Sequence, residues 1–295
     1  MKTILLTGAT GFLGSHLLEA LLNKDYEVVI LKRSTSNTWR IDHLLKRVVS
    51  YDIDHSDIEL AFIEQQINVV IHTACNYGRN GEHISEIVDA NLMFGLRLID
   101  ASIKHNTNAF VNTDTMLDKN LNDYTLSKKQ LVEWLEHKST NLKVANLKIE
   151  HIYGEKDDST KFIPWLINQF DNGVAKIKLT SGDQLRDFIY IQDVVFAYLI
   201  VLKQSEILPR FSEFDVGTGD SISVKAFIHK LKECYESEFG AIHSELSFGE
   251  IPLREGEDMH VKVDNSDLIS MGWQPSMSID NGIIKLLQGR SSSLL

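Results

Sequence analysis

The fold of this 295-residue chain is decided by the stretch Lys2-Thr-Ile-Leu-Leu-Thr-Gly-Ala-Thr-Gly-Phe-Leu-Gly14. Its first part is a short apolar run, typical of a buried parallel strand. Apolar residues then recur at helical spacing over 12–22. A strand, a glycine turn and a helix in this order form a cradle for the phosphates of a dinucleotide. A plain tight turn between strand and helix is the alternative interpretation.

The three glycines of this turn have different expected tasks. Gly8 permits the sharp turn, Gly11 lets the backbone approach a pyrophosphate, and Gly14 lets the helix pack closely on the sheet. The spacing is Gly-x-x-Gly-x-x-Gly and not the more usual Gly-x-Gly-x-x-Gly. We expect cofactor contacts from Gly8, Thr10, Gly11, Phe12, Leu13 and Gly14.

Strand and helix patterns alternate through the first half of the chain. Strands are expected at 27–32, 47–52, 68–72, 109–112 and 142–149, with a long helix at 85–104. This series predicts an α/β fold, a Rossmann-type doubly wound parallel sheet with right-handed crossovers. From about Gly154 short strands and helices mix with loops. We therefore predict a cofactor-binding Rossmann domain at 1–154, with a return segment near 187–216, and a smaller C-terminal substrate-binding lobe, mainly 155–295.

Composition narrows the class of protein. The chain is 43% hydrophobic and carries a net charge of −11, which argues against a nucleic-acid or anionic-membrane surface. Two distant cysteines, Cys75 and Cys234, imply no disulfide framework and fit a reducing cytosol. Met1 leads straight into the first strand, and no apolar run has membrane-spanning length, so we expect a cytoplasmic protein. Histidine and cysteine spacing predicts no metal site.

Tyr124 and Lys128 stand four residues apart in a predicted helix and therefore share one face. A phenol has an ordinary pKa of ~10, and a nearby ammonium is expected to lower it. Such a pair can exchange a proton during a carbonyl/alcohol interconversion. A chance match on an ordinary helix is the alternative, and the glycine turn upstream favours the catalytic interpretation.

Together the glycine turn and Tyr124-x-x-x-Lys128 resemble the extended short-chain dehydrogenase/reductases. Further segments resemble the nucleotide-sugar branch of that family: His72-Thr-Ala, Asn91, Gly182-Asp-Gln-Leu-Arg-Asp-Phe-Ile-Tyr-Ile-Gln-Asp193, Phe214-Asp-Val-Gly-Thr-Gly219 and Met271-Gly-Trp-Gln-Pro275. The run 112–130 is most similar to 4-ketoreductases of activated 6-deoxy sugars, the class that includes the CDP-abequose and CDP-paratose synthases.

The resemblance implies catalytic roles. Thr113 would hold the reacting sugar oxygen beside Tyr124, which would protonate it. Lys128 would bind the nicotinamide ribose, and Asn91 would support a link to Lys128. A strand-end threonine favoured by β-propensity is the alternative for Thr113.

Asp114 and Thr115 separate the possible reactions. By comparison, sugar 4,6-dehydratases carry Thr-Asp-Glu here and use both acids to eliminate water. This chain has Thr115 in place of the glutamate, so elimination is disfavoured and reduction or epimerisation remains. Both residues are expected to contact the substrate.

The second strand ends in Lys32, Arg33 and Ser34, where NAD-preferring relatives place an acid. Basic residues attract a 2′-phosphate, which predicts NADP(H), although a solvated basic strand end is the alternative. The resemblance adds further predicted cofactor contacts. Asp52 and Ile53 would contact the adenine, with a surface turn as the alternative. Thr73 and Ala74, which follow the fourth strand, would contact the cofactor too.

The resemblance also places residues around a nucleotide sugar. Arg186 and Arg254 resemble diphosphate clamps, and a surface salt bridge is the alternative for Arg254. Lys161 and Phe162 would add a charge and an aromatic face. His151 stands where relatives often have asparagine, so its role in binding competes with a structural one.

The expected activity is NADPH-dependent reduction of a nucleotide-linked 4-keto-6-deoxyhexose for surface polysaccharide. The expected assembly is a homodimer through a four-helix bundle. A C4 epimerase with tightly held NAD is the nearest alternative. A non-catalytic NADP-binding regulator is the alternative from another class.

Overall fold

The computed structural model describes residues 2–291 and divides into two compact units. The first contains the chain up to Ile149, then Val195–Val216 and Ser266–Trp273. The second contains Glu150–Val194, Gly217–Asn265 and the chain from Gln274 onward. Within the described residues, no helix is both long and apolar enough to cross a membrane.

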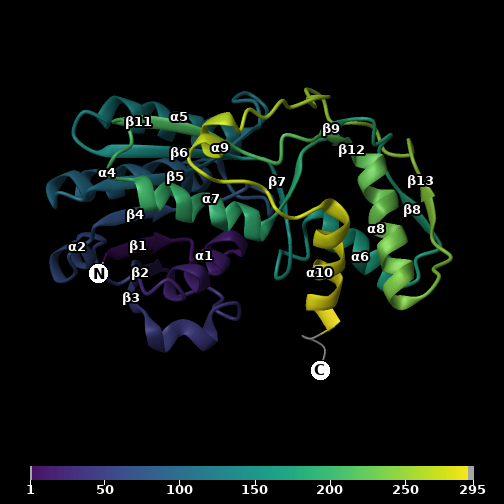
Figure 1. The fold of residues 1–295 in the computed structure, drawn as a ribbon, viewed down its shortest axis with the longest axis horizontal. Coiled ribbons are helices and arrows are strands. Elements are labelled where there is room, and N and C mark those ends of the chain that lie inside the picture. The colour runs from purple at the N-terminus through teal and green to yellow at the C-terminus, as the bar shows by residue number, and fades with distance from the viewer. Residues whose placement is uncertain (1, 292–295) are drawn as a thin grey trace. The chain divides into compact units, whose positions relative to one another are not determined.

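The first unit is built on a sheet of seven parallel strands (Figure 1). Their order is β11-β6-β5-β4-β1-β2-β3. This arrangement confirms the predicted Rossmann-type doubly wound sheet. The strands are β1 (Thr3–Thr7), β2 (Glu27–Lys32), β3 (Val49–Asp52), β4 (Val69–His72), β5 (Ala109–Thr115), β6 (Lys143–Ile149) and β11 (Phe211–Val216).

The strand order reverses between β1 and β4. From β1 the chain moves outward to β2 and β3, and from β4 it moves the other way to β5, β6 and β11. The connections that leave the ends of β1 and β4 therefore diverge, and the carboxyl ends of strands at such a reversal are where doubly wound sheets bind their ligands. Thr7 and His72 are register partners at this point, and the glycine turn follows Thr7.

Helices cover both faces of this sheet because the strand residues are apolar on both. One face packs on α2, α4 and α5 through a core that includes Leu5, Val70 and Phe110. Figure 1 shows α1 and α7 on the near face. The helices are α1 (Phe12–Leu22), η1 (Asp42–Arg47), α2 (Glu59–Glu64), α3 (Ile84–Val88), η2 (Asp89–Met93), α4 (Phe94–Lys104), α5 (Asp123–Lys138), α7 (Ile191–Gln204, beginning in the second unit) and α9 (Ser266–Ser270).

The predicted long helix at 85–104 is present, with one irregularity. Its middle section, η2, is a π-helix that contains the buried Asn91. Such π segments often mark functional sites because the wider turn displaces side chains from regular helical spacing.

The second unit is smaller, and its described residues form three two-stranded sheets, β7–β10, β9–β12 and β8–β13. The aromatic rings of Phe188 and Phe227 stack inside it, with centroids 3.9 Å apart. Its elements are β7 (His151–Tyr153), α6 (Phe162–Asp171), β8 (Lys176–Lys178), β9 (Leu185–Arg186), β10 (Phe188–Tyr190), β12 (Ile222–Ser223), α8 (Val224–Phe239), β13 (Glu245–Ser247) and α10 (Ile279–Ser291).

Candidate active site

The glycine turn is packed so tightly that a Cβ atom would clash with backbone atoms at Gly8 and Gly14. A Cβ atom on Gly14 would lie 2.0 Å from the carbonyl oxygen of Gly8, and one on Gly11 would lie 3.2 Å from the same atom. Gly8 has φ +70°, and its Cβ would lie 2.6 Å from Thr73 Oγ1 and 2.7 Å from the Ala74 nitrogen. Thr73 and Ala74 therefore pack directly on the turn that the predicted glycines form.

Helix α1 begins at Phe12, directly after Gly11, without a side-chain cap. Within residues 2–291, the amides of Leu13 and Gly14 have no intrahelical or capping partner and can therefore bind an anion. This uncapped helix start, beside a turn without space for a Cβ at Gly8 or Gly14, fits a dinucleotide pyrophosphate.

Arg40 is a residue that the sequence interpretation did not include. Its guanidinium donates to the Thr10 carbonyl at 3.2 Å, and so braces the turn from the far end of a loop. In the sequence, Arg40 is an isolated arginine thirty residues after Thr10. No local pattern distinguishes such a residue from an ordinary charged surface residue.

The end of β2 combines basic and acidic groups. Lys32 is partly exposed and Arg33 is exposed, so both charges remain accessible. Ser34 donates to Asp54 Oδ2 from its backbone nitrogen at 2.9 Å and from its hydroxyl at 2.7 Å. These hydrogen bonds lower the pKa of Asp54. The predicted adenine pair, Asp52–Ile53, follows β3 beside this turn, where Lys32 and Asp52 are register partners.

Tyr124 lies in the first turn of α5. Asn122 caps this helix, and its side chain accepts from the Thr125 nitrogen at 2.9 Å. Burial raises the pKa of Tyr124 well above its ordinary value, and the charges of Cys75 and Asp114 add to this effect. Arg79 and the neighbouring Thr115 side chain act in the opposite direction.

The expectation that Lys128 would lower the Tyr124 pKa is therefore wrong for the protein without ligands. Desolvation of the phenolate outweighs any attraction by an ammonium. Lys128 itself is 2% exposed, and burial lowers its pKa. Among residues 2–291 its Nζ atom has no hydrogen-bond or ion-pair partner. A buried ammonium without a partner fits the hydroxyls of a nicotinamide ribose.

Strand alternation separates the three neighbouring residues on β5. Thr113 and Thr115 share one face, and the Thr113 hydroxyl lies 2.7 Å from Tyr198 Oη of α7. Asp114 points to the other face, where its carboxylate pairs with Lys129 of α5 at 2.7 Å. The Asp114 side chain is only 1% exposed, so the predicted substrate contact is corrected to a structural ion pair.

Asn91 is buried, and its side-chain amide is hydrogen-bonded. Its side chain accepts from the Asn76 nitrogen at 2.6 Å and donates to the Asn76 oxygen at 2.8 Å and to Ser127 Oγ at 3.0 Å. Ser127 in turn donates to the Tyr124 carbonyl at 2.9 Å. Asn91 thus ties the loop after β4 to α5, and its side-chain bonds go to Asn76 and Ser127 rather than to Lys128.

That loop brings a second aromatic ring to Tyr124. The ring centroid of Tyr77 lies 4.9 Å from that of Tyr124, and the Arg79 guanidinium lies over Tyr77 at 5.1 Å. Tyr77 is 41% exposed. Sequence reasoning missed both residues because neither belongs to a recognised motif.

In the second unit, the predicted substrate residues have local partners. His151 Nδ1 lies 2.7 Å from the buried Glu150 carboxylate, and Lys161 pairs with Asp157 at 3.1 Å. Phe162 is 40% exposed and stacks on Trp165.

The two predicted diphosphate clamps differ. Arg186 is 3% exposed, and its guanidinium pairs with Glu257 at 2.5 Å. Its charge is therefore already compensated. Arg254 is exposed, and within the described part of the chain it makes no ion pair, so the alternative of a surface salt bridge is not found.

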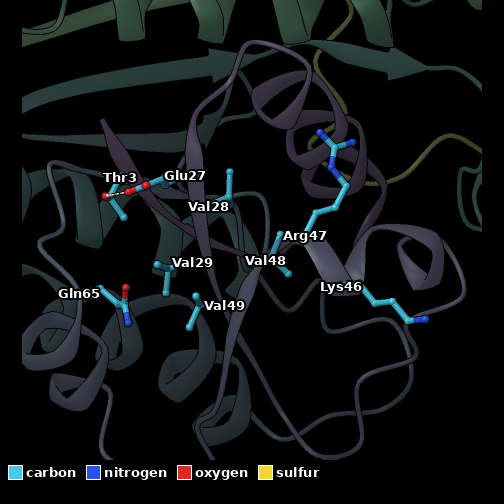
Figure 2. Close-up of a pocket in the computed structure, with 9 residues that line it drawn as sticks. All are labelled: Thr3, Glu27, Val28, Val29, Lys46, Arg47, Val48, Val49 and Gln65. Atoms are coloured by element: carbon cyan, nitrogen blue, oxygen red, sulfur yellow. Dashed lines mark hydrogen bonds between the residues drawn. The ribbon is translucent and has the colours of Figure 1, made fainter. Parts of the chain in front are cut away.

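A hollow of about 370 Å³ lies at the opposite edge of the sheet, and Figure 2 shows residues that line it. Its lining includes Thr3, Glu27 and Val49, the first residues of β1, β2 and β3. Ligands of doubly wound sheets bind at the carboxyl ends of the strands, so this hollow is not the reaction site.

Comparison with known proteins agrees with this geometry. Residues 4–217 match the NAD dependent epimerase/dehydratase family. The chain belongs to this family. It is 33% identical to the CDP-abequose synthase of Salmonella typhimurium, with 97% of each chain covered. It is 26% identical to a putative UDP-glucose 4-epimerase of Methanocaldococcus jannaschii, covering 96% of this chain and 97% of that one. The resemblance to the nucleotide-sugar branch of the extended short-chain dehydrogenase/reductases is confirmed.

Solved structures of this family share the fold. The UDP-glucose 4-epimerase of Thermotoga maritima, solved with UDP-glucose, superposes with a TM-score of 0.85 at 21% identity, covering 99% of this chain and 100% of that one. The Thermus thermophilus enzyme, solved with NAD, gives 0.83 at 21% identity, covering 99% of each chain.

Proposed function

We propose that this protein reduces the 4-keto group of a nucleotide-activated 4-keto-6-deoxyhexose with NADPH. The observation that carries the proposal is the place of Thr115, whose side chain lies close enough to the Tyr124 phenol to lower its pKa. A hydroxyl at position 115 leaves the proton donor in place but supplies no carboxylate for eliminating water. The raised pKa of Tyr124 also favours this direction, because a protonated phenol is the form that donates.

The substrate class is supported by the 33% identity to CDP-abequose synthase over 97% of both chains. We favour a CDP-linked 3,6-dideoxyhexose such as abequose or paratose as the product, with dTDP-linked 6-deoxyhexoses as further candidates. The product would enter surface polysaccharide, such as a lipopolysaccharide O-antigen.

Each catalytic side chain has one task in this proposal. Tyr124 donates its proton to the oxygen that develops on sugar C4. Thr113 holds that oxygen through its hydroxyl. Lys128 places its charge near the same centre and binds the nicotinamide ribose, while Asn91 positions α5 through Ser127. The nicotinamide, when bound, supplies the hydride.

The cofactor is held by the glycine turn, with Thr73 and Ala74 packed on it. Lys32 and Arg33 are accessible and attract a 2′-phosphate, which supports NADPH. Asp52 and Ile53 flank the adenine. For the nucleotide sugar we retain Arg254, His151, Lys161 and Phe162. Arg186 requires release from Glu257 before it can bind a phosphate.

We also propose a cytoplasmic homodimer. Met93 of η2 and Trp134 of α5 are 43% and 45% exposed. Large apolar side chains at these positions suit the expected bundle of η2–α4 and α5 with their copies.

One observation favours the second candidate, an NAD-dependent C4 epimerase. Asp54 holds Ser34 through two hydrogen bonds, and carboxylates at this end of the sheet suit free ribose hydroxyls better than a phosphate. That enzyme must retain its cofactor through the reaction, so the purified protein would carry stoichiometric nicotinamide.

The experiment is NADPH oxidation, followed by its absorbance, with verified CDP- and dTDP-4-keto-6-deoxy sugars, including 3-deoxy forms, and NADH in parallel. Substrate-dependent loss of NADPH supports the reductase and identifies its nucleotide. No loss with any substrate, together with NAD in the purified protein, supports the epimerase. No loss of NADPH with any substrate, together with binding of NADP but not of NAD, supports a non-catalytic regulator.

A further inference from the structure

Tyr198 is a buried residue that no sequence motif marks. It lies on α7 with 1% of its surface exposed, and its Oη atom is 2.7 Å from Thr113 Oγ1. Both residues belong to the first unit. Thr113 is partly exposed, so the pair has one buried end and one accessible end.

Burial decides which hydroxyl donates. Within residues 2–291, Thr113 is the one hydrogen-bond partner of the Tyr198 hydroxyl. If Thr113 donated, the Tyr198 hydrogen would be buried without an acceptor, which is strongly disfavoured. If Tyr198 donates, the Thr113 hydrogen points toward the accessible side, where water or a ligand oxygen accepts it. A phenol is also the more acidic of the two hydroxyls.

We propose that Tyr198 is a positioning residue that keeps Thr113 a hydrogen-bond donor toward the oxygen of the reacting sugar. The inference rests on the proposed function. Without Tyr198, the Thr113 hydroxyl is free to rotate and to offer a lone pair to the sugar oxygen instead. That orientation opposes the negative charge that develops on the oxygen during reduction, so the loss concerns the transition state more than substrate binding.

Burial also raises the pKa of Tyr198. The phenol therefore keeps its proton at neutral pH and remains a donor. The nearby side chains of Asp114 and Cys75 act in the same direction, while the hydrogen bond to Thr113 opposes them.

The test is a double-mutant cycle with Tyr198→Phe and Thr113→Val, read as kcat and KM for the keto sugar, NADPH affinity and midpoint of thermal unfolding. Tyr198→Phe is expected to lower kcat about tenfold with KM and NADPH affinity unchanged. In the Thr113→Val background the same change is expected to alter kcat less than twofold, because the group that it orients is gone. In a Thr113→Ser background, which keeps the hydroxyl, the tenfold loss returns.

A tenfold loss in the Thr113→Val background as well would overturn the inference, because a merely structural tyrosine acts independently of residue 113. An unchanged kcat in Tyr198→Phe would overturn it too. Tyr235→Phe is the matched control, since it removes a hydrogen bond from a tyrosine that is 7% exposed and bound to Asp171 at 2.9 Å. A wild-type protein that turns over none of the sugars would instead refute the proposed function, and this inference with it.

Discussion

Thr115, at the end of strand β5, lies close enough to Tyr124 of α5 for its side chain to lower the pKa of the phenol. By the resemblance, Thr115 occupies the position at which the dehydratases of the family carry a glutamate. The proposed proton donor therefore has a neutral neighbour where those enzymes have a base. Two of the predictions below concern this pair.

Replacing Thr115 tests whether its hydroxyl assists Tyr124. Thr115→Val removes the hydroxyl at nearly constant volume, and with it the acceptor of the Leu117 amide. We expect kcat for reduction to fall about fivefold to tenfold, the size expected for the loss of one net polar interaction of about 1 kcal/mol. Thr115→Ser, the matched control, should retain most of the wild-type kcat. Equal losses in both variants would show that the methyl group matters and not the hydroxyl.

Removing the proton donor has a larger effect. Tyr124→Phe deletes one oxygen atom, and we expect kcat to fall by about 100-fold to 10,000-fold. The affinity for NADPH, measured by cofactor fluorescence, should stay within about twofold, because the pyrophosphate site is separate. Full turnover by this variant would remove Tyr124 as the acid.

The glycine turn predicts two different failures. Gly14→Ala puts a Cβ 2.0 Å from the Gly8 oxygen, so helix α1 must move and both the unfolding temperature and cofactor affinity should fall. Gly11→Ala brings a Cβ only to 3.2 Å of that atom, so we expect weaker NADPH binding with a nearly unchanged unfolding temperature. Thermal unfolding with and without NADPH measures both. The opposite ranking of the two unfolding temperatures would contradict the packing argument.

We expect cofactor preference to depend on the residues at the end of β2. The double variant Lys32→Gln/Arg33→Gln removes both accessible charges while keeping side-chain length. We expect the KM for NADPH to rise about tenfold to 100-fold, as expected for loss of charge-assisted hydrogen bonds. The KM for NADH, which has no 2′-phosphate, should change less than about twofold. An equal rise for both cofactors would mean that these residues contact a part that NADPH and NADH share.

His72 makes stability depend on pH. Burial, reinforced by the charge of Lys128, lowers the pKa of His72 to about 3 from 6.5. The folded state therefore keeps this imidazole neutral, while the unfolded chain binds a proton below pH 6.5. The stabilisation is complete above that pH and is lost as pH falls toward 3. Between pH 7 and pH 5 we expect a loss of about 2 kcal/mol in the free energy of unfolding.

The control for His72 is His72→Gln, measured by denaturant unfolding at the same two pH values. The variant should show a smaller loss, and the difference between the two proteins isolates His72 from other groups that titrate. An identical pH dependence in both proteins would mean that His72 can be protonated within the fold.

The sequence by itself determined the parallel sheet, the glycine turn and the Tyr124–Lys128 pair. These depend on local periodicity and spacing: short apolar runs specify buried strands, and a four-residue interval places two side chains on one helix face. For the same reason, the predicted glycines and Thr73 lie together at the end of β1.

Only the tertiary structure decided the surroundings of these residues. Tyr198, Arg40 and Tyr77 approach the site from distant segments, and no local pattern reveals such contacts. Asp114 was predicted to contact a substrate because sugar dehydratases carry an acid at this place, yet alternation along β5 turns it toward Lys129. The pKa of Tyr124 likewise follows from burial. Desolvation depends on all the atoms packed around a group, which spacing along the chain does not encode.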